Sequence, residues 1–177
     1  LDMPFQHISD PVLKKMNRKI TRKEIETTMA RVRRQLPDVA WRTTFIVGFP
    51  TETDQDFEEL VDYVSEGHFQ HLGIFLYSDE DNIRSSKYGD PIPISLKEER
   101  KNRLMEIQQK ISREHHQKMV GSLQQVLVGG FSSETDLLLE GRNQYQGPEV
   151  DGVVYINEGY ATSAGFHQVE ITEAHEY

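Results

Sequence analysis

The residues best suited to bind a small molecule lie in the segment Arg42 to Thr53, which reads Arg-Thr-Thr-Phe-Ile-Val-Gly-Phe-Pro-Thr-Glu-Thr. Gly48 follows a run of β-branched and aromatic residues, and a ligand can approach its main chain closely because glycine has no Cβ. Glu52 could accept a hydrogen bond from a ligand, and the amides at the start of the next helix favour a negative group. The competing interpretation is that Gly48 and Pro50 only shape the turn and that Glu52 only favours its helix through the dipole.

Three further residues are expected near this turn. Gln6 and Tyr77 each follow or end an expected strand, so both belong to the edge where the carboxyl ends of parallel strands meet. Arg18 closes the helix after the first strand and could fold back to this edge, where its guanidinium would orient a ligand carboxylate. The alternative, that Arg18 is a surface charge, stays open. The residue types predict ligand binding but identify no catalytic group.

The sequence predicts no metal site. The chain contains no cysteine, which excludes a disulfide, a thiolate metal site and a thiol nucleophile within it. The pairs His68/His71 and His115/His116 lack the helical i, i+4 spacing with a nearby carboxylate that a zinc site shows. No apolar run is long enough to span a bilayer, and no signal-peptide pattern is present. We expect a cytoplasmic protein and, because the chain does not begin with Met, a piece of a longer one.

Strands and helices alternate up to about residue 119. Strands are expected at 1–5, 43–47 and 72–77, the second of them buried on both faces. Each intervening or following helix is expected to begin at a capping residue, namely Asp10, Thr21, Thr53 or Ser95. This order predicts a parallel sheet with right-handed crossovers. Three strands cannot close a barrel, so residues 1–119 are expected to be half of an α/β domain.

Residues 120–177 follow a different pattern. Short β-rich runs separated by glycine-rich turns predict a small antiparallel β-barrel. The net charge of the chain is −9, and this region holds nine acidic residues and one basic residue, Arg142. Such a surface argues against binding a nucleic-acid backbone, which needs Lys and Arg, and favours a basic protein partner. The alternative is that the charge only aids solubility.

Several segments resemble those of the radical S-adenosylmethionine (SAM) methylthiotransferases. Residues 1–10, followed by Met16-Asn17-Arg18, are similar to the family segment Met-Pro-x-Gln-His-x-Ser. Residues 42–53 are similar to Arg-Thr-Thr-Phe-Ile-Val-Gly-Phe-Pro-Gly-Glu-Thr of the family. Residues 73–78 resemble the last barrel strand, and residues 100–112 resemble the helix that follows it.

The C-terminal region resembles the TRAM module of the same family. Its segment Gly-Pro-Glu-Val-Asp-Gly-Val-Val, residues 147–154, resembles the branch that modifies a ribosomal protein (RimO-like) more than the tRNA-modifying branch. Two departures stand out: Thr51 occupies a position where the family commonly has glycine, and Asn82-Ile83 replaces a Gly-Thr pair.

The resemblance implies a fold and an activity. The fold would be the C-terminal half of a radical SAM partial (βα) barrel, followed by a TRAM-like β-barrel. The full-length enzyme would attach a methylthio group to the β-carbon of an aspartate in a small-subunit ribosomal protein, the twelfth of its series, using SAM and two 4Fe–4S clusters. Clusters need thiolates, and this chain has no cysteine, so it is expected to be inactive by itself.

The resemblance also implies roles for single residues. Gly48, Pro50 and their neighbours, Glu52 included, would lie beside the SAM adenine, with Phe75 and Tyr77 on the adjoining strand. Gln6 and Arg18 are candidates for the polar end of the cofactor.

In the C-terminal module, Glu149 and Asp151 are expected near the contact with the basic ribosomal protein. Three alternatives remain: a tRNA-modifying enzyme of the same family, a non-catalytic binding module, and a phosphate-binding fragment of an ordinary eight-stranded barrel.

Overall fold

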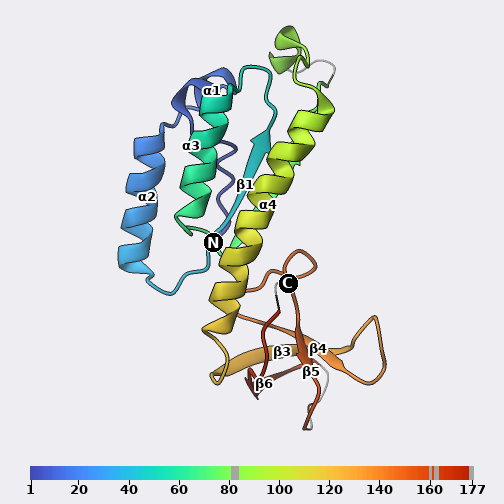
Figure 1. Cartoon of the computed structure of the whole chain (residues 1–177). Helices are drawn as coiled ribbons and strands as arrows, with labels where there is room; N and C mark the ends of the chain where they lie inside the picture. Colours follow the sequence, from blue (N-terminus) through green and yellow to red (C-terminus); the bar gives the residue numbers. More distant parts are fainter. Residues whose placement is uncertain (81–83, 160, 162–163, 176–177) are drawn as a thin grey trace. The chain divides into compact units, whose positions relative to one another are not determined.

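A computed structural model describes residues 1–80, 84–159, 161 and 164–175 (Figure 1). The chain divides into two compact units, Leu1–Ile111 (unit 1) and Ser112–Tyr177 (unit 2). Asn82 and Ile83, the second departure from the family pattern, lie outside the described residues. Within the described ranges, no helix has the length and apolar character needed to cross a membrane.

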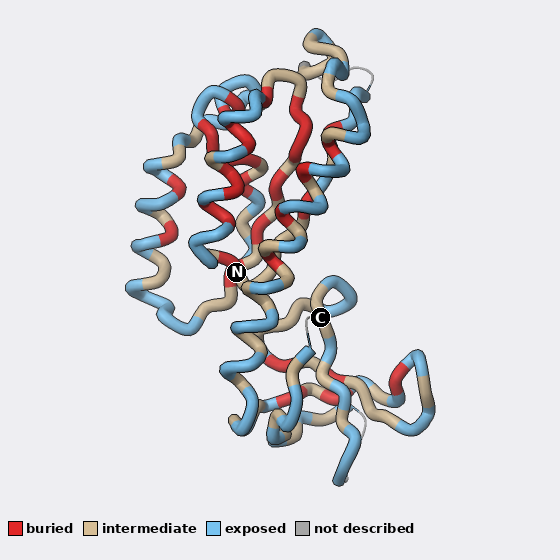
Figure 2. Tube along the Cα trace, viewed as in Figure 1, coloured by how far each residue is buried: buried red, intermediate tan, exposed pale blue. Residues whose placement is uncertain are grey.

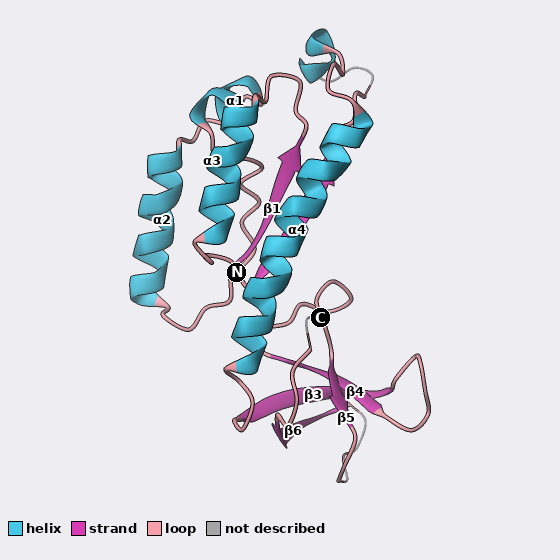
Figure 3. Cartoon of the chain, in the orientation of Figure 1, coloured by secondary structure: helices cyan, strands magenta, loops and turns pink. Residues whose placement is uncertain are grey.

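Two of the predicted helix starts in unit 1 are confirmed. Helix α2 spans Arg22–Gln35 and helix α3 spans Asp54–Ser65 (Figure 3). Thr21 and Thr53 both form capping boxes, in which the threonine side chain accepts from the third helical amide and the acidic residue there accepts from the threonine amide. These caps depend on residues three positions apart, so the local sequence is enough to predict them.

The other two predicted starts are wrong by one or two residues. Helix α1 spans Asp10–Lys15 and has Ser9, not Asp10, as its N-cap. The Asp10 carboxylate instead accepts a hydrogen bond from the Arg22 amide at 2.7 Å. Helix α4 spans Ile94–Gln117, so Ser95 lies inside it. The carbonyl of Pro93 accepts hydrogen bonds from two amides of the first turn of α4, those of Leu96 and Lys97, at 3.0 and 3.2 Å.

Unit 1 contains a parallel sheet of two regular strands. Strand β1 (Arg42–Val47) pairs with β2 (His71–Leu76) in a register that runs from Arg42↔His71 to Val47↔Leu76. The N-terminal segment runs parallel to β1 and makes isolated bridges with it at Asp2 and Gln6. The third expected strand is therefore an extended segment with irregular pairing. A short 3₁₀ helix, η1 (Arg84–Tyr88), precedes α4.

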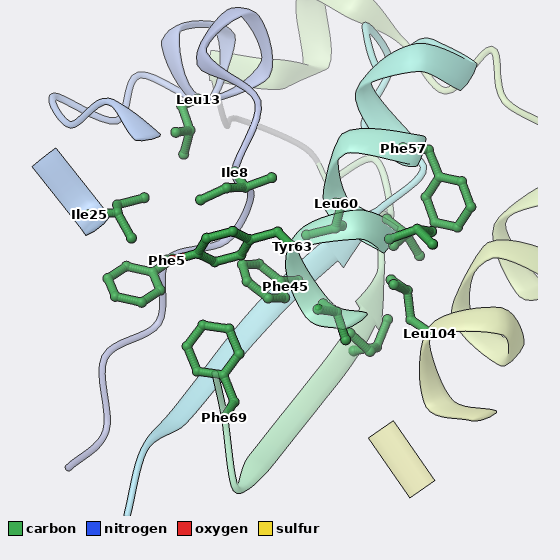
Figure 4. Packing of buried hydrophobic residues seen from close by; sticks show 14 of the residues in the cluster. Phe5, Ile8, Leu13, Ile25, Phe45, Phe57, Leu60, Tyr63, Phe69 and Leu104 are labelled. Carbon is green, nitrogen blue, oxygen red and sulfur yellow. The ribbon is translucent and has the colours of Figure 1, made fainter. Parts of the chain in front are cut away.

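Helices α2, α3 and α4 cover one face of this sheet (Figures 1 and 2). Apolar side chains from all three meet those of the strands, and Figure 4 shows Phe5, Phe45 and Phe69 gathered beneath α3. The rings of Phe45 and Phe69 lie edge to face, with their centroids 5.8 Å apart. The helices contribute Ile25, Leu60 and Leu104 to this hydrophobic core, and none of these three side chains has exposed surface.

The opposite face of the sheet is only partly covered, which corrects the expectation of a strand buried on both faces. Thr43, Phe45 and Val47 of β1 are buried, whereas the alternating residues, Thr44 and Ile46 among them, keep partial exposure. Phe75 of β2 is paired with Ile46 and is 61% exposed. Because successive residues of a strand point to opposite faces, helices bury one side and leave an apolar second side.

Unit 2 is built on a four-stranded antiparallel sheet with the order β5-β4-β3-β6. The strands are β3 (Leu123–Phe131), β4 (Leu139–Asn143), β5 (Val154–Ile156) and β6 (Gly165–Glu170). Val126 and Val128 of β3 are fully buried. The predicted antiparallel arrangement is confirmed, whereas closure into a barrel stays a prediction.

Gly141 provides a test of packing in unit 2. A Cβ there would stand 2.6 Å from Val126 Cγ1 and 2.8 Å from the carbonyl oxygen of Leu127. We expect Gly141→Ala to destabilise the sheet by about 1–3 kcal/mol, because the strand must shift to relieve the overlap. Hydrogen–deuterium exchange of β3 and β4 peptides measures the change. Gly129→Ala is the control, since its Cβ meets nothing closer than 3.7 Å; equal protection in both variants would contradict the packing.

His7 is a fully buried histidine in unit 1. Its Nδ1 accepts a hydrogen bond from the Ser9 amide at 3.0 Å, so the neutral ring carries its proton on Nε2. Nε2 has no hydrogen-bond partner within the described part of the chain. Burial lowers the pKa of His7 to about 4, an effect that Asp56 partly offsets and Arg100 reinforces.

The lowered pKa of His7 predicts an acid-sensitive unit 1. The pKa of His7 is about 6.5 in the unfolded state and about 4 in the folded state. The stability that comes from keeping His7 neutral is therefore fully present above about pH 6.5 and is lost as the pH falls toward 4. The full loss is roughly 3 kcal/mol. Urea unfolding followed by fluorescence of Trp41, the single tryptophan, measures it between about pH 7 and pH 4.5.

His7→Asn is the comparison variant for this experiment, because Asn keeps an acceptor for the Ser9 amide and does not titrate. Its stability should fall less with acid than that of the wild type. Parallel curves for the two proteins would mean that His7 is not held neutral.

Candidate functional site

The turn after β1 requires glycine at its first position. Gly48 has φ +75°, a backbone conformation that residues with a Cβ rarely adopt. A Cβ on Gly48 would also stand 2.3 Å from Cγ and 2.7 Å from Cδ of Lys97. The space left by the missing side chain is thus filled by a lysine of α4. Whether a ligand approaches Gly48 from another side stays a prediction.

The amides of this turn are bound by a carboxylate of the same chain. Glu52 Oε2 accepts hydrogen bonds from the amides of Gly48 and Phe49, the latter at 3.1 Å. The Glu52 side chain has no exposed surface. These two donors of the turn are occupied within the protein. Glu52 therefore shapes the turn, and a direct contact of Glu52 with a ligand stays a prediction.

Arg100 of α4 balances the charge of Glu52. Its Nη1 lies 3.2 Å from Glu52 Oε1, an ion pair by distance whose angles are not those of a hydrogen bond. Its Nη2 donates to Asp54 Oδ1 at 2.6 Å, and its guanidinium lies 5.2 Å from the centre of the Phe57 ring. Burial raises the pKa of Glu52 to about 7, against the opposing effects of Arg100 and the Gly48 and Phe49 amides.

The end of β2 meets the same turn through aromatic side chains. The rings of Tyr77 and Phe49 lie edge to face with centroids 5.3 Å apart, and the Tyr77 amide donates to the Val47 carbonyl at 2.9 Å. Tyr88 of η1 packs against Phe49 at 6.2 Å. The sequence prediction that Gly48 and Tyr77 share one edge of the sheet agrees with these contacts.

Lys97 joins the two strand ends. Its side chain is 2% exposed, and its Nζ donates to the Tyr77 carbonyl at 2.8 Å and to the Asp90 carboxylate at 2.5 and 2.6 Å. The ammonium also lies 5.4 Å from the centre of the Tyr77 ring. One buried cation thus contacts the turn after β1, the end of β2 and the loop before α4.

The remaining predicted cofactor residues lie in different settings. Gln6 is bridged to Phe45 of β1 and has φ +74°, which is unusual for a residue other than glycine. Pro50 is half-buried in the turn, and Phe75 is exposed on the uncovered face of the sheet. Arg18 is exposed in the connection between α1 and α2. The structure brings Gln6, Pro50 and Tyr77 to the strand ends and shows no contact of Arg18 with them.

The two predicted docking residues lie in a loop of unit 2. Glu149 is exposed and has φ +64°. The Asp151 carboxylate accepts a hydrogen bond from the Gly147 amide at 2.6 Å, so it also fixes the loop. A docking role for either residue stays a prediction.

Sequence reasoning missed Lys97 and Arg100. They are three positions apart on α4, and together with Leu104 and Gln108 they form the buried side of that helix. The signal was present, because the apolar stripe of α4, extended toward its N-terminus, passes through both cations. A charged residue in line with such a stripe needs a counter-charge, and here Asp90 and Glu52 supply one each.

The described residues hold no group of three or more His, Asp or Glu side chains placed to bind a metal ion. The whole sequence lacks cysteine. Iron–sulfur clusters are held by thiolates, so the residues of this chain do not fit such a cluster.

Comparison with known proteins identifies two domain types in the order expected. Residues 1–64 match the model of the Radical SAM superfamily, and residues 120–177 match the model of the TRAM domain.

Individual relatives are similar over the whole chain. A ribosomal protein uS12 methylthiotransferase RimO from Bdellovibrio bacteriovorus is 51% identical over 176 residues, which is 99% of this chain and 38% of that protein. Proteins of the same name from Geobacter sulfurreducens and Desulfotalea psychrophila are 42% and 45% identical over 177 residues, covering all of this chain and 40% of each relative. The chain thus spans about two fifths of the length of these relatives. It belongs to the RimO-like family of radical SAM methylthiotransferases.

Proposed function

We propose that this chain is the C-terminal part of an enzyme that methylthiolates the β-carbon of an aspartate in ribosomal protein uS12. The observation that supports it most is the similarity to RimO proteins, which covers 99% of the chain, and so both units, at 51% identity. The proposed enzyme acts in the cytoplasm, where its ribosomal substrate is made.

The proposed fold of residues 1–119 is half of a partial (βα) barrel, and residues 120–177 form the TRAM-like barrel. The sheet of unit 1 supports the first part, because helices cover one of its faces and the other carries half-exposed Ile46 and exposed Phe75. In a barrel of this kind the uncovered face is the interior. The rest of a longer protein would complete it.

We place SAM at the carboxyl ends of β1 and β2. Phe75 offers an exposed apolar ring for the adenine, and the backbone at Gly48, Pro50 and Tyr77 borders the same edge. Gln6, whose left-handed backbone turns the N-terminal segment beside β1, and Arg18 would take the polar end of the cofactor. SAM would supply a carbon radical when it is cleaved. The residues of this chain bind and orient the nucleoside.

The two 4Fe–4S clusters of the proposed enzyme must be held by another part of the longer protein, since this chain lacks thiolates. The chain alone is therefore expected to be inactive.

The acidic unit 2 would dock the substrate. Residues 120–177, which make up most of unit 2, hold nine acidic residues and one basic residue, Arg142. Opposite charges steer association of protein partners. We infer that Glu149 and Asp151 lie near the contact with a basic ribosomal protein.

The activity is tested with the full-length enzyme, purified without oxygen and loaded with clusters. Incubation with SAM, a reductant, a sulfur source and uS12 should yield uS12 carrying one methylthio group on an aspartate, detected by tandem mass spectrometry. The chain of residues 1–177 alone should yield none. Modification of tRNA with unmodified uS12 would overturn the proposal in favour of the tRNA-modifying branch. Modification of neither would favour a binding module.

The docking role predicts an effect of charge reversal in the same enzyme. Glu149→Lys should raise KM for uS12 by about 3- to 10-fold at low salt, with a smaller effect at high salt where exposed charges are screened. Steady-state kinetics across a salt series measures it. Glu98→Lys, an exposed position on α4, is the matched control and should change KM little. Equal changes in both variants would indicate a general charge effect and not docking at Glu149.

A further inference from the structure

Two buried cations of α4 hold the edge of the sheet at which we place SAM. Lys97 and Arg100 are 1% and 3% exposed, and both side chains point to the turn after β1. Burying a charged side chain is costly unless it is paired and hydrogen-bonded. An arrangement that places two of them one helical turn apart at a strand end therefore calls for an explanation beyond helix packing.

The contacts of Lys97 differ from those of an ordinary buried ion pair. Asp90, its carboxylate partner, has a side chain that is 34% exposed, so this partner alone did not require the lysine to be buried. Besides the two carboxylate oxygens of Asp90, the Lys97 ammonium binds the main-chain oxygen of Tyr77, at the end of β2. The methylene stem of Lys97 fills the space beside Gly48 that a Cβ would occupy. The ammonium and the stem thus fix two strand ends separately.

We propose that Lys97 is a positioning residue for the SAM nucleoside. It sets the distance between the turn at Gly48 and the end of β2 at Tyr77 without touching the cofactor. This inference rests on the proposed function, because it assumes that SAM lies at this edge. Arg100 does the same for the other side of the turn, where Glu52 binds the amides of Gly48 and Phe49.

The proposal distinguishes the two parts of the lysine. Removal of the ammonium leaves the Tyr77 carbonyl without its donor and Asp90 without its partner, while an apolar stem of similar length still packs on Gly48. Lys97→Met makes this change. Removing one partner of a buried ion pair destabilises a fold, but the Asp90 side chain is 34% exposed, so water can solvate the carboxylate that is left. Asp90→Asn is the milder change, since the ammonium keeps its bond to the Tyr77 carbonyl.

The test uses the full-length enzyme with its clusters loaded. We expect Lys97→Met to raise the Kd for SAM by about 10-fold, and the KM for SAM by a similar factor, with kcat at saturating SAM changed less than about 3-fold. Asp90→Asn should raise Kd by about 3-fold. Lys110→Met, at an exposed position of α4, is the matched control and should bind SAM as the wild type does. Equilibrium dialysis gives Kd, and circular dichroism confirms that each variant is folded at the temperature of the assay.

A lysine with only a structural role would lower the temperature of unfolding and leave Kd for SAM unchanged in the folded protein. That result for Lys97→Met would overturn the inference. If Lys97→Met does not fold, Asp90→Asn decides: a folded Asp90→Asn enzyme with wild-type Kd overturns the inference, and a raised Kd supports it. A wild-type enzyme that binds no SAM would overturn the proposed function itself, so the two failures are distinguishable.

Discussion

The carboxylate of Glu52 is the constraint on which the arrangement of unit 1 depends. A strand that ends in a tight turn leaves main-chain amides without partners, and buried amides must be paired. Glu52 accepts from two of them, those of Gly48 and Phe49. Its own charge is then buried and needs a cation. Arg100 provides it from a helix that is far away in the sequence, so this ion pair ties the N-terminal part of α4 to the turn after β1.

The one-sided cover of the sheet connects this constraint to function. With α2, α3 and α4 on one face, the buried cations of α4, Lys97 and Arg100, contact the sheet at the carboxyl ends of its strands. The other face keeps Phe75 exposed, and additional chain could cover it. Relatives that are more than twice as long as the chain have the additional residues to do so.

The elements of unit 1 could be predicted where their determinants are local. The capping boxes at Thr21 and Thr53 involve residues three positions apart, and both were predicted correctly. The cap at Ser95 was not, because Pro93 accepts the first amides of α4. In the candidate site, the proximity of Gly48 and Tyr77 could be predicted, because both follow strands that run parallel and end at the same edge of the sheet. The roles of Lys97 and Arg100 could not be predicted, since their partners depend on tertiary packing.

The occupied amides also bear on the kind of ligand that this edge can bind. A phosphate-binding barrel needs free main-chain donors at the strand ends, since an anion is held by such groups. Here Glu52 accepts from the Gly48 and Phe49 amides, so neither amide is free to bind a phosphate. What this part of the sheet still offers is the exposed apolar ring of Phe75 on the open face, since Phe49 and Tyr77 are buried against each other. This favours an uncharged planar group such as an adenine over a phosphate, and with it a nucleoside-binding edge over the fragment of an ordinary eight-stranded barrel.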